Sequence, residues 1–258
     1  MTEAAGTMGP ASASIDGVMR LYRRSLTQSW LPALLLSLLW TGLLARLLLA
    51  LDAQDDVLQL AAQLQELVFA PSFGYALLAA TAVSVLPYCA IVACVLAGET
   101  GRKAAGAGLP IALRLFPGAL VATTLFLVLT SIGTMALLVP GVYLWGMWQL
   151  WIVVMVAERS GPLAALARSW QLTRGSWWPA VTLVTLITIL SMVPLVLLDF
   201  ILPSILLVLG ISATQALMAN LLCLGLASIL VLPLVPAALV ALYRSLSSRQ
   251  PVSAGEKR

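Results

Sequence analysis

The chain has 258 residues, of which 61% are hydrophobic and only 9% are charged. Soluble globular domains carry roughly 25% charged residues, so this composition excludes an ordinary soluble enzyme. The formal net charge of +4 does not indicate a nucleic-acid partner, because a long basic face needs soluble surface to carry it.

Six apolar runs are long enough to cross a membrane, which takes about 20 residues of helix. From the N-terminus they are Trp30–Leu51, Gly74–Ala97, Gly118–Val139, Gly141–Ala157, Pro179–Phe200 and Thr214–Tyr243. We therefore predict an all-α fold, a polytopic membrane helix bundle of six transmembrane helices over residues 14–246. We expect disordered tails at residues 1–13, which lack the cationic start of a signal peptide, and at residues 247–258.

Short amphipathic helices are predicted at the membrane surface between the spans. Apolar residues three and four apart place one apolar stripe on a helix. The pattern occurs in Ile15–Leu26 and Leu109–Phe116 and, on the other side of the membrane, in Val57–Val68. A further helix is expected to start near Pro162 and to stop at Gly175, because these residue types suit those ends. Its apolar stripe consists of Leu163, Leu166, Ala167 and Trp170.

The charged residues alternate between the two sides of the predicted spans. Thirteen of the 14 Lys and Arg residues fall before span one, between spans two and three, between spans four and five, or after span six. The opposite side holds no cation and five carboxylates, namely Asp52, Asp55, Asp56, Glu66 and Asp199. Because basic loops of membrane proteins stay in the cytoplasm, we expect both termini to be cytoplasmic.

Prolines, glycines and small residues predict where the spans turn, bend and pack. Pro140 is expected to break the helix between spans three and four, and Gly141 to permit a tight hairpin there. Pro233 and Pro236 predict a kink near the end of span six. On the same span, a row of small residues favours close helix packing, namely Ala219, Cys223 and Ala227.

Two short sequences predict an internal repeat. "SWLPA" at Ser29–Ala33 matches "SWWPA" at Ser176–Ala180, and each follows a cationic amphipathic helix and opens a span. "ALRLFPGAL" at Ala112–Leu120 is a weaker echo in the middle of the chain. One interpretation is three parallel units, each a surface helix followed by a two-span hairpin. The alternative is chance agreement in a biased composition.

Four charged residues are candidate contacts for a lipid headgroup or a substrate, namely Arg46, Glu158, Arg168 and Arg174. Arg46 is the only cation inside a predicted span. It either snorkels outward, pairs with one of the aspartates Asp52, Asp55 and Asp199, or forms a substrate or ion site.

The other three candidates lie on the predicted cytoplasmic side. Glu158 ends span four, where it is either an ordinary interfacial carboxylate, a tie to Arg168 or Arg174, or a contact for a headgroup. The two arginines can reach anionic lipid phosphates, and each such cation contributes on the order of 1 kcal/mol to membrane binding. Anionic headgroups on the cytoplasmic face are therefore the predicted partners.

Polar side chains inside the spans have two interpretations. The amides of Gln149 and Asn220 are expected to form hydrogen bonds between helices. Hydroxyls recur in span three (Thr123, Thr124, Thr130, Ser131, Thr134) and in span five (Thr182, Thr185, Thr188, Ser191). They either line a cavity or bond back to their own helix.

The sequence contains no histidine. This excludes a Ser-His-Asp triad and His-ligated metal sites. Fingerprints for dinucleotides, for phosphate-binding loops and for the nucleophile elbow of hydrolases are also absent from the sequence. We therefore expect no catalytic residue, no cofactor and no metal.

One long segment resembles a known family. It is "VPGVYLWGMWQLWIVVMVAERSGPLAALARSWQLTRGSWWPA", from Val139 to Ala180. It resembles the YciC-like uncharacterised bacterial membrane proteins and the membrane domain attached to some glycerophosphodiester phosphodiesterases. The shared residues are Pro140, Gly141, Tyr143, Glu158, Ala165, Leu166, Ser169, Leu172, Gly175 and Trp178, with Tyr243 and Leu246 after the last span. The resemblance implies a multi-span protein of the bacterial inner membrane and supplies no catalytic residue.

These observations favour a non-catalytic membrane protein that acts in scaffolding, lipid interaction or envelope maintenance, alone, as a homo-oligomer or with a membrane-protein partner. The alternative is a transporter or exporter of a small or lipid-like substrate. A scaffold predicts a closed core of small residues. A transporter predicts a cavity at mid-membrane, lined by the hydroxyls of spans three and five or by Arg46.

Overall fold

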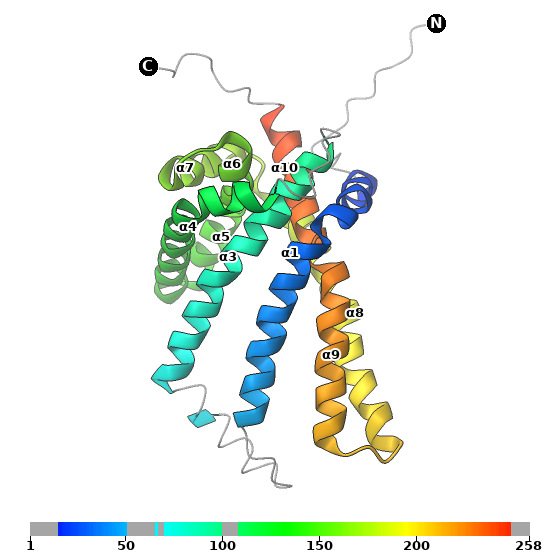
Figure 1. The fold of residues 1–258 in the computed structure, drawn as a ribbon. Helices are drawn as coiled ribbons and strands as arrows, with labels where there is room; N and C mark the ends of the chain where they lie inside the picture. The colour runs from blue at the N-terminus through cyan, green and yellow to red at the C-terminus, as the bar shows by residue number, and fades with distance from the viewer. Residues whose placement is uncertain (1–14, 51–64, 67–69, 100–107, 249–258) are drawn as a thin grey trace, which may run out of the picture.

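The computed structural model describes residues 15–50, 65–66, 70–99 and 108–248. Within these ranges the fold is helical and contains no strand. The helices are α1 (Ile15–Ala50), α3 (Pro71–Glu99), α4 (Gly108–Ala136), α5 (Leu138–Trp148), α6 (Trp151–Glu158), α7 (Pro162–Thr173), α8 (Trp177–Val208), α9 (Ala213–Val231) and α10 (Leu234–Ser247). Figure 1 shows one bundle, with the beginning of α1 and the end of α10 on the same side. We call this side the terminal end and the opposite side the far end.

The six predicted spans are present. Six stretches are long and apolar enough, by length and composition, to cross a membrane: Asp16–Arg46, Gly74–Ala97, Gly108–Met135, Val139–Glu158, Trp177–Val208 and Gln215–Ser247. Each overlaps one predicted span, so the all-α, six-span fold class is confirmed. The predicted tail at 1–13, most of the tail at 247–258 and most of the helix at 57–68 lie outside the described residues.

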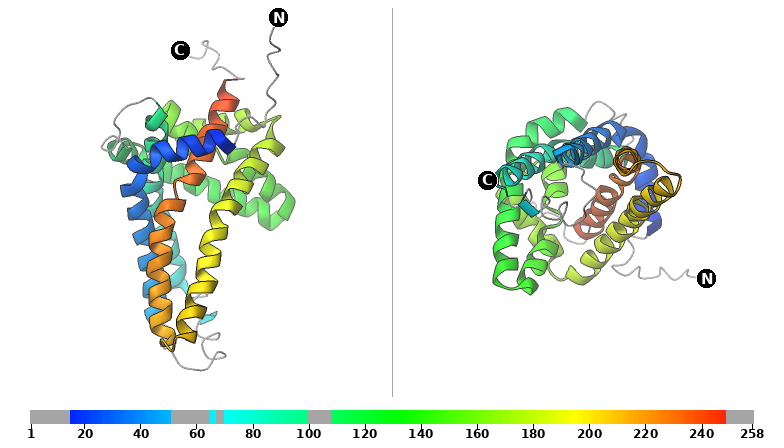
Figure 2. Two further views of the ribbon diagram at one scale, coloured as in Figure 1. Left: turned by 90° about the vertical axis from the view of Figure 1, so that its right-hand side faces the viewer. Right: turned by 90° about the horizontal axis from the view of Figure 1, so that it is seen from below.

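The spans pack as three neighbouring hairpins. Helix α1 packs on α3, α4 on α5, and α8 on α9. Seen along the bundle, the hairpins form a ring, and α10 lies inside it (Figure 2). This arrangement contains the hairpins that the predicted repeat needs, while the repeat itself stays a prediction.

The core lies where the returning helices of the three hairpins meet. Helices α3, α6 and α10 contact one another. Their most buried stretches are Cys89–Val95, Trp151–Val156 and Ala237–Val240, in which no residue is more than 8% exposed. Because most of these side chains are small or β-branched, the three backbones approach closely and leave little empty space. We call these three stretches the central core.

Two of the predicted surface helices are not separate elements. Helices α1 and α4 run without a break through Ile15–Leu26 and Leu109–Phe116 into the spans that follow. Each contains one proline beyond its first turn, Pro32 or Pro117, and a helix bends where the proline N–H is missing. Figure 2 shows the first turns of α1 lying across the bundle before the helix runs along it. The third surface helix, α7, is separate because Gly175 follows it with φ at +88°.

The turn between α4 and α5 lies earlier than predicted. Leu137 separates the two helices in an extended conformation, with φ at −163° and ψ at 140°. Pro140 lies in the first turn of α5, where backbone N–H groups have no partner within the helix, so the missing N–H of proline costs no hydrogen bond. Gly141 permits close approach instead of a turn, because a Cβ there would lie 2.7 Å from Cα of Thr134 on α4.

Span four consists of two helices, where the sequence predicts one. The chain turns at Gln149 and Leu150 between α5 and α6, although neither is a residue that usually ends a helix. Span six breaks where prolines predict it, since Pro233 separates α9 from α10. The helix that follows each break contributes to the central core: α6 follows the break in span four, and α10 follows the break in span six.

The predicted row of small residues on α9 is only partly buried, because Cys223 is exposed while the other two members are half-buried. The close contact lies at Gly225, where a Cβ would come within 2.8 Å of the Thr41 hydroxyl oxygen. Next to it, Ser228 donates a hydrogen bond to the Ser37 hydroxyl at 2.9 Å. A glycine and a hydroxyl pair therefore form the closest described contact between α9 and α1.

Candidate functional site

Glu158 joins three helices at the terminal end of the bundle. It is the last residue of α6, and its Oε1 accepts a hydrogen bond from the Tyr243 hydroxyl of α10 at 3.0 Å. The same oxygen lies 3.5 Å from Nε of Arg168 in α7, and the two charged side chains are only 24% and 17% exposed. The predicted tie between Glu158 and Arg168 is confirmed. The contact with Tyr243, 85 residues away, has no signal in the sequence.

Arg174 takes no part in this cluster. It lies at the C-terminal end of α7, where its backbone N–H bonds to the carbonyl of Trp170, and its residue is exposed. Whether Arg174, Arg168 or Glu158 contacts a lipid headgroup stays a prediction.

Helix α7 buries Leu166 of the predicted stripe but packs mainly through residues outside it. Leu163 of that stripe is 69% exposed. The buried residues are Ala165, Leu166, Ser169, Leu172 and Thr173. Ser169 donates a hydrogen bond to the carbonyl of Met147 in α5 at 3.0 Å. Hydrogen-bonded hydroxyls therefore form part of the buried face, which a stripe of apolar side chains alone does not show.

Aromatic side chains hold the start of α8 against α5. Trp177 stacks on Tyr143, with ring centroids 5.6 Å apart, and donates its Nε1–H to the Tyr143 carbonyl at 3.2 Å. Trp170 of α7 meets the same tyrosine edge-on at 6.0 Å. Such ring pairs contribute about 0.5–1.5 kcal/mol each beyond area burial. Contacts with Tyr143 of α5 therefore hold in place the end of α7 and the start of α8.

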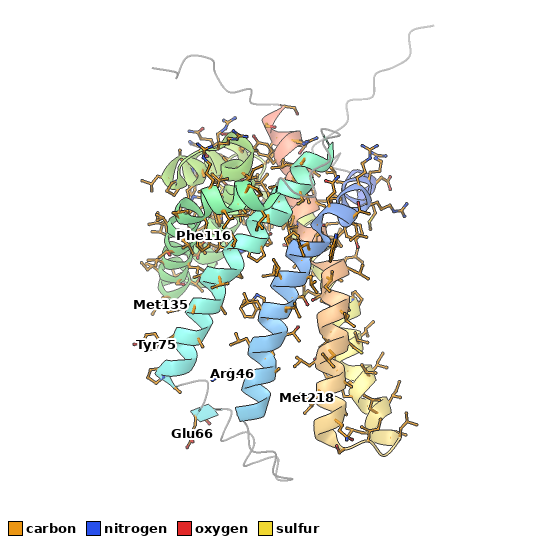
Figure 3. The ribbon with its side chains drawn as sticks, viewed as in Figure 1. Arg46, Glu66, Tyr75, Phe116, Met135 and Met218 are labelled. Atoms are coloured by element: carbon orange, nitrogen blue, oxygen red, sulfur yellow. The ribbon has the colours of Figure 1, made fainter. Side chains whose placement is uncertain are left out.

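Arg46 lies at the far end of the bundle (Figure 3). It is exposed, and within the part of the chain that the structure describes it makes no ion pair. The proposed pairing with Asp199 is not present. Instead, Oδ1 of Asp199 accepts a hydrogen bond from Nδ2 of Asn220 at 2.7 Å. This bond joins α8 to α9, as predicted for Asn220. The other two proposed partners, Asp52 and Asp55, lie outside the described residues.

A cavity of about 480 Å³ lies between the three hairpins. Residues of α1, α3, α4, α5, α6, α8 and α10 line it, and most of them are apolar, for example Trp40, Phe126 and Leu239. The α3 residues in the lining, from Thr81 to Tyr88, directly precede the central core. The central core therefore closes the cavity towards the terminal end.

Gln149 adds an amide to this largely apolar wall. It lies in the turn between α5 and α6 and is 8% exposed. Neither its Nε2 nor its Oε1 has a hydrogen-bond partner among the residues that the structure describes. Leaving a buried polar group unpaired costs about 1–3 kcal/mol. The predicted bond from Gln149 to another helix is therefore wrong, and both polar atoms of its amide are buried without a partner beside the cavity.

Two of the hydroxyls singled out in the sequence also line the cavity, those of Thr123 and Thr188. Each donates its proton to a carbonyl of its own helix, at 2.7 Å to Ala119 and 2.8 Å to Val184. Their oxygens can still accept a hydrogen bond. A cavity with this lining suits an apolar molecule that carries one or two polar groups better than it suits a hydrated ion.

The comparisons with known proteins add no relative. No protein-family model, no curated protein and no solved structure matches the chain. The resemblance to YciC-like proteins therefore stays a prediction. Within the described ranges, no three Cys, Asp or Glu residues form a group that could hold a metal ion. The fold therefore defines the class of the protein. It is an all-helical bundle with the six apolar helices of a multi-pass membrane protein.

Proposed function

We propose that this protein is a non-catalytic, multi-pass protein of the bacterial inner membrane that binds a lipid-like molecule between its hairpins. The observation that carries the proposal is the unpartnered amide of Gln149 in the wall of the 480 Å³ cavity. The inner-membrane location rests on the resemblance to YciC-like proteins and on the distribution of basic residues.

Selective binding in this cavity depends on Gln149. Inside a bilayer an acyl chain gains no hydrophobic energy by moving from lipid into an apolar cavity, because both surroundings are hydrocarbon. Preference for one molecule must come from shape and from hydrogen bonds. An ester, amide or hydroxyl group of a lipid-like molecule would satisfy the Gln149 amide, whose unpaired state costs about 1–3 kcal/mol.

The central core supports the scaffolding part of this proposal. Small side chains close the bundle on one side of the cavity, as expected for a rigid support of a bound lipid, a second copy or a membrane-protein partner. Arg46, which the sequence offered as a substrate contact, does not line the cavity.

The test is photo-crosslinking of the full-length protein in vesicles of phosphatidylethanolamine and phosphatidylglycerol, with a phospholipid that carries a diazirine in its acyl chain. We expect labelling of the cavity wall around Thr123 and Phe126. Thr188→Trp fills the cavity and is expected to abolish most of this labelling, whereas Leu186→Trp, at a 48%-exposed position of the same helix, is expected to retain it. Equal labelling in the two variants contradicts a cavity site.

Transport of a lipid-like molecule is the second candidate, because Thr123 of span three and Thr188 of span five line the cavity as a transporter predicts. It requires the central core to open. Reconstituted vesicles that contain a fluorescent phospholipid distinguish binding from transport. If the protein binds lipid without transport, added dithionite quenches only the fluorescence of the outer leaflet. Loss of both leaflets' fluorescence supports transport instead.

A further inference from the structure

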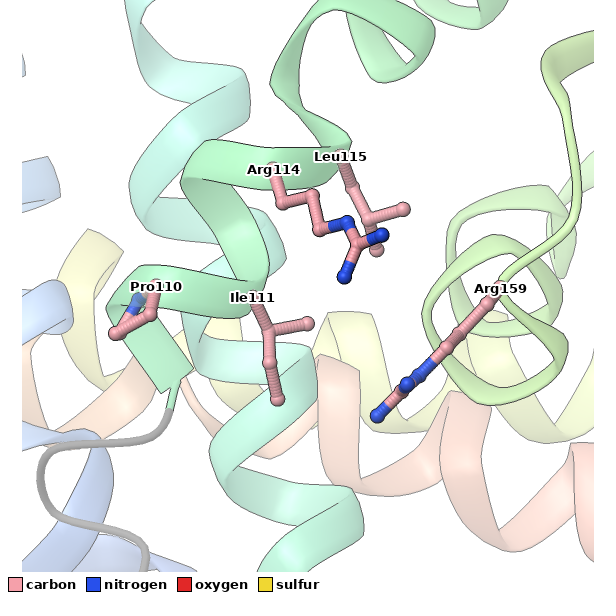
Figure 4. A pocket seen from close by; sticks show the side chains of 5 residues that line it. All are labelled: Pro110, Ile111, Arg114, Leu115 and Arg159. Atoms are coloured by element: carbon pink, nitrogen blue, oxygen red, sulfur yellow. The ribbon is translucent and has the colours of Figure 1, made fainter.

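A second pocket, of about 350 Å³, lies at the terminal end of the bundle, away from the cavity between the hairpins. Its lining consists of Pro110, Ile111, Arg114 and Leu115 from the first turns of α4, and of Arg159. Figure 4 shows the guanidinium groups of Arg114 and Arg159 directed into the same space from opposite sides. Ile111 lies at one side of this space and adds an apolar wall.

The backbone holds Arg159 in an unusual conformation. It ends α6 with φ at 51° and ψ at 35°, and it is the only non-glycine residue with positive φ among the residues that the structure describes. Helices often end in this left-handed conformation, but usually at a glycine, since a side chain there costs roughly 1–2 kcal/mol. The position therefore carries a strained arginine where glycine is the less costly residue.

The positive charge in this pocket is not neutralised by the described residues. Neither Arg114 nor Arg159 makes an ion pair with a carboxylate within the described ranges. The neighbouring carboxylate, Glu158, is already engaged by Arg168 and Tyr243. Two guanidinium groups that face one pocket repel each other, and an anion between them removes that repulsion.

We infer that Arg114 and Arg159 form a binding site for a phosphate group. Arginine presents a planar fork of N–H donors that matches phosphate oxygens, and two arginines suit a phosphate better than a single-point anion. The apolar side chains of Ile111 and Leu115 fit the glycerol backbone and first acyl carbons of a phospholipid. The pocket also lies near the beginning of a membrane-spanning helix, where lipid phosphates are found. The site is independent of the cavity between the hairpins.

The test measures phosphatidylglycerol bound to the purified full-length protein by native mass spectrometry, in competition with phosphatidylcholine. The double variant Arg114→Gln/Arg159→Gln is expected to bind phosphatidylglycerol at least about tenfold more weakly, since charge-assisted hydrogen bonds are lost. Arg114→Lys/Arg159→Lys keeps the charge but not the fork and is expected to lose part of the binding. Both arginines are exposed, so these variants are expected to fold, which circular dichroism checks.

Arg23→Gln/Arg24→Gln is the matched control, because it also removes two exposed arginines at the terminal end, in the first turns of α1, and both lie outside the pocket. Equal weakening by this control and by the Arg114/Arg159 double variant overturns the site and indicates general surface charge. Inorganic phosphate is titrated in parallel. One outcome is that low-millimolar phosphate displaces the lipid and binds to the wild type but not to the double variant. The phosphate site is then supported, and its ligand is a soluble phosphate compound and not a lipid. Cavity labelling by the acyl-chain probe is expected to persist in the double variant.

Discussion

At the level of single residues, Glu158 shows how one carboxylate stabilises a junction of three helices. It ends α6, accepts a hydrogen bond from Tyr243 of α10 and pairs with Arg168 of α7. An exposed ion pair contributes less than about 1 kcal/mol, but a partly buried hydrogen-bonded carboxylate leaves two donors unpaired when it is removed.

Replacement of Glu158 by alanine is expected to lower the free energy of unfolding by about 1–3 kcal/mol, because Arg168 and Tyr243 then lose their acceptor. Tyr243→Phe removes one hydrogen bond and is expected to cost about 1 kcal/mol. Denaturant unfolding of the full-length protein in detergent measures both. Tyr75→Phe is the control, since Tyr75 is 72% exposed at the far end. A cost for Tyr243→Phe no larger than for Tyr75→Phe contradicts the proposed role.

Gln149 also shows why residue-level prediction fails inside a membrane bundle. Its amide and that of Asn220 look alike in the sequence, yet Asn220 bonds to Asp199 and Gln149 has no partner among the described residues. The difference arises because Asn220 lies opposite the carboxylate of Asp199, whereas no described polar group lies within hydrogen-bond reach of the Gln149 amide. Which of two buried amides finds a partner depends on the packing of helices that are distant in sequence.

At the level of helices, glycine determines how closely two of them approach. Gly141 of α5 faces Thr134 of α4 so closely that a Cβ would overlap the Thr134 backbone. The sequence assigns Gly141 to a turn, but the turn lies at Leu137 and proline is tolerated in the first helical turn. The sequence therefore predicts the hairpin, but it places the turn too late and assigns the wrong role to the glycine.

Gly141→Ala is expected to destabilise the α4–α5 hairpin by about 1–3 kcal/mol, because the added methyl group forces the two backbones apart. Gly42→Ala is the matched control, since a Cβ at this helical position meets nothing within 4 Å, and it is expected to stabilise the protein by up to about 1 kcal/mol. Thermal unfolding followed by circular dichroism measures both. An unchanged or higher midpoint for Gly141→Ala would contradict the close approach.

For the whole molecule, the distribution of basic residues predicts the orientation in the membrane. The fold places the beginning of α1 and the end of α10 on one side of the bundle, and Arg46 on the other (Figure 3). The positive-inside rule then predicts that the terminal end is cytoplasmic. Arg46, at the far end, is the one described cation that departs from this distribution.

Reporter fusions test the orientation. A fusion after Arg174, between α7 and α8, is expected to be cytoplasmic, and a fusion after Gly210, between α8 and α9, is expected to be active on the opposite side. A periplasmic signal from the Arg174 fusion would overturn the orientation and, with it, the cytoplasmic location of the phosphate site.

By itself the sequence determined the fold class and the six spans, because a membrane-crossing helix depends on local apolar length, which can be read from consecutive residues. It also indicated the break at Pro233, since proline acts on its own helix. Tertiary structure alone decided which faces are buried and which polar groups meet. The buried face of α7 includes Ser169, and Arg114 and Arg159 line one pocket, because packing brings together residues far apart in the chain. In a chain that is 61% hydrophobic, polarity does not distinguish a core face from a lipid face, so only the packed structure identifies them.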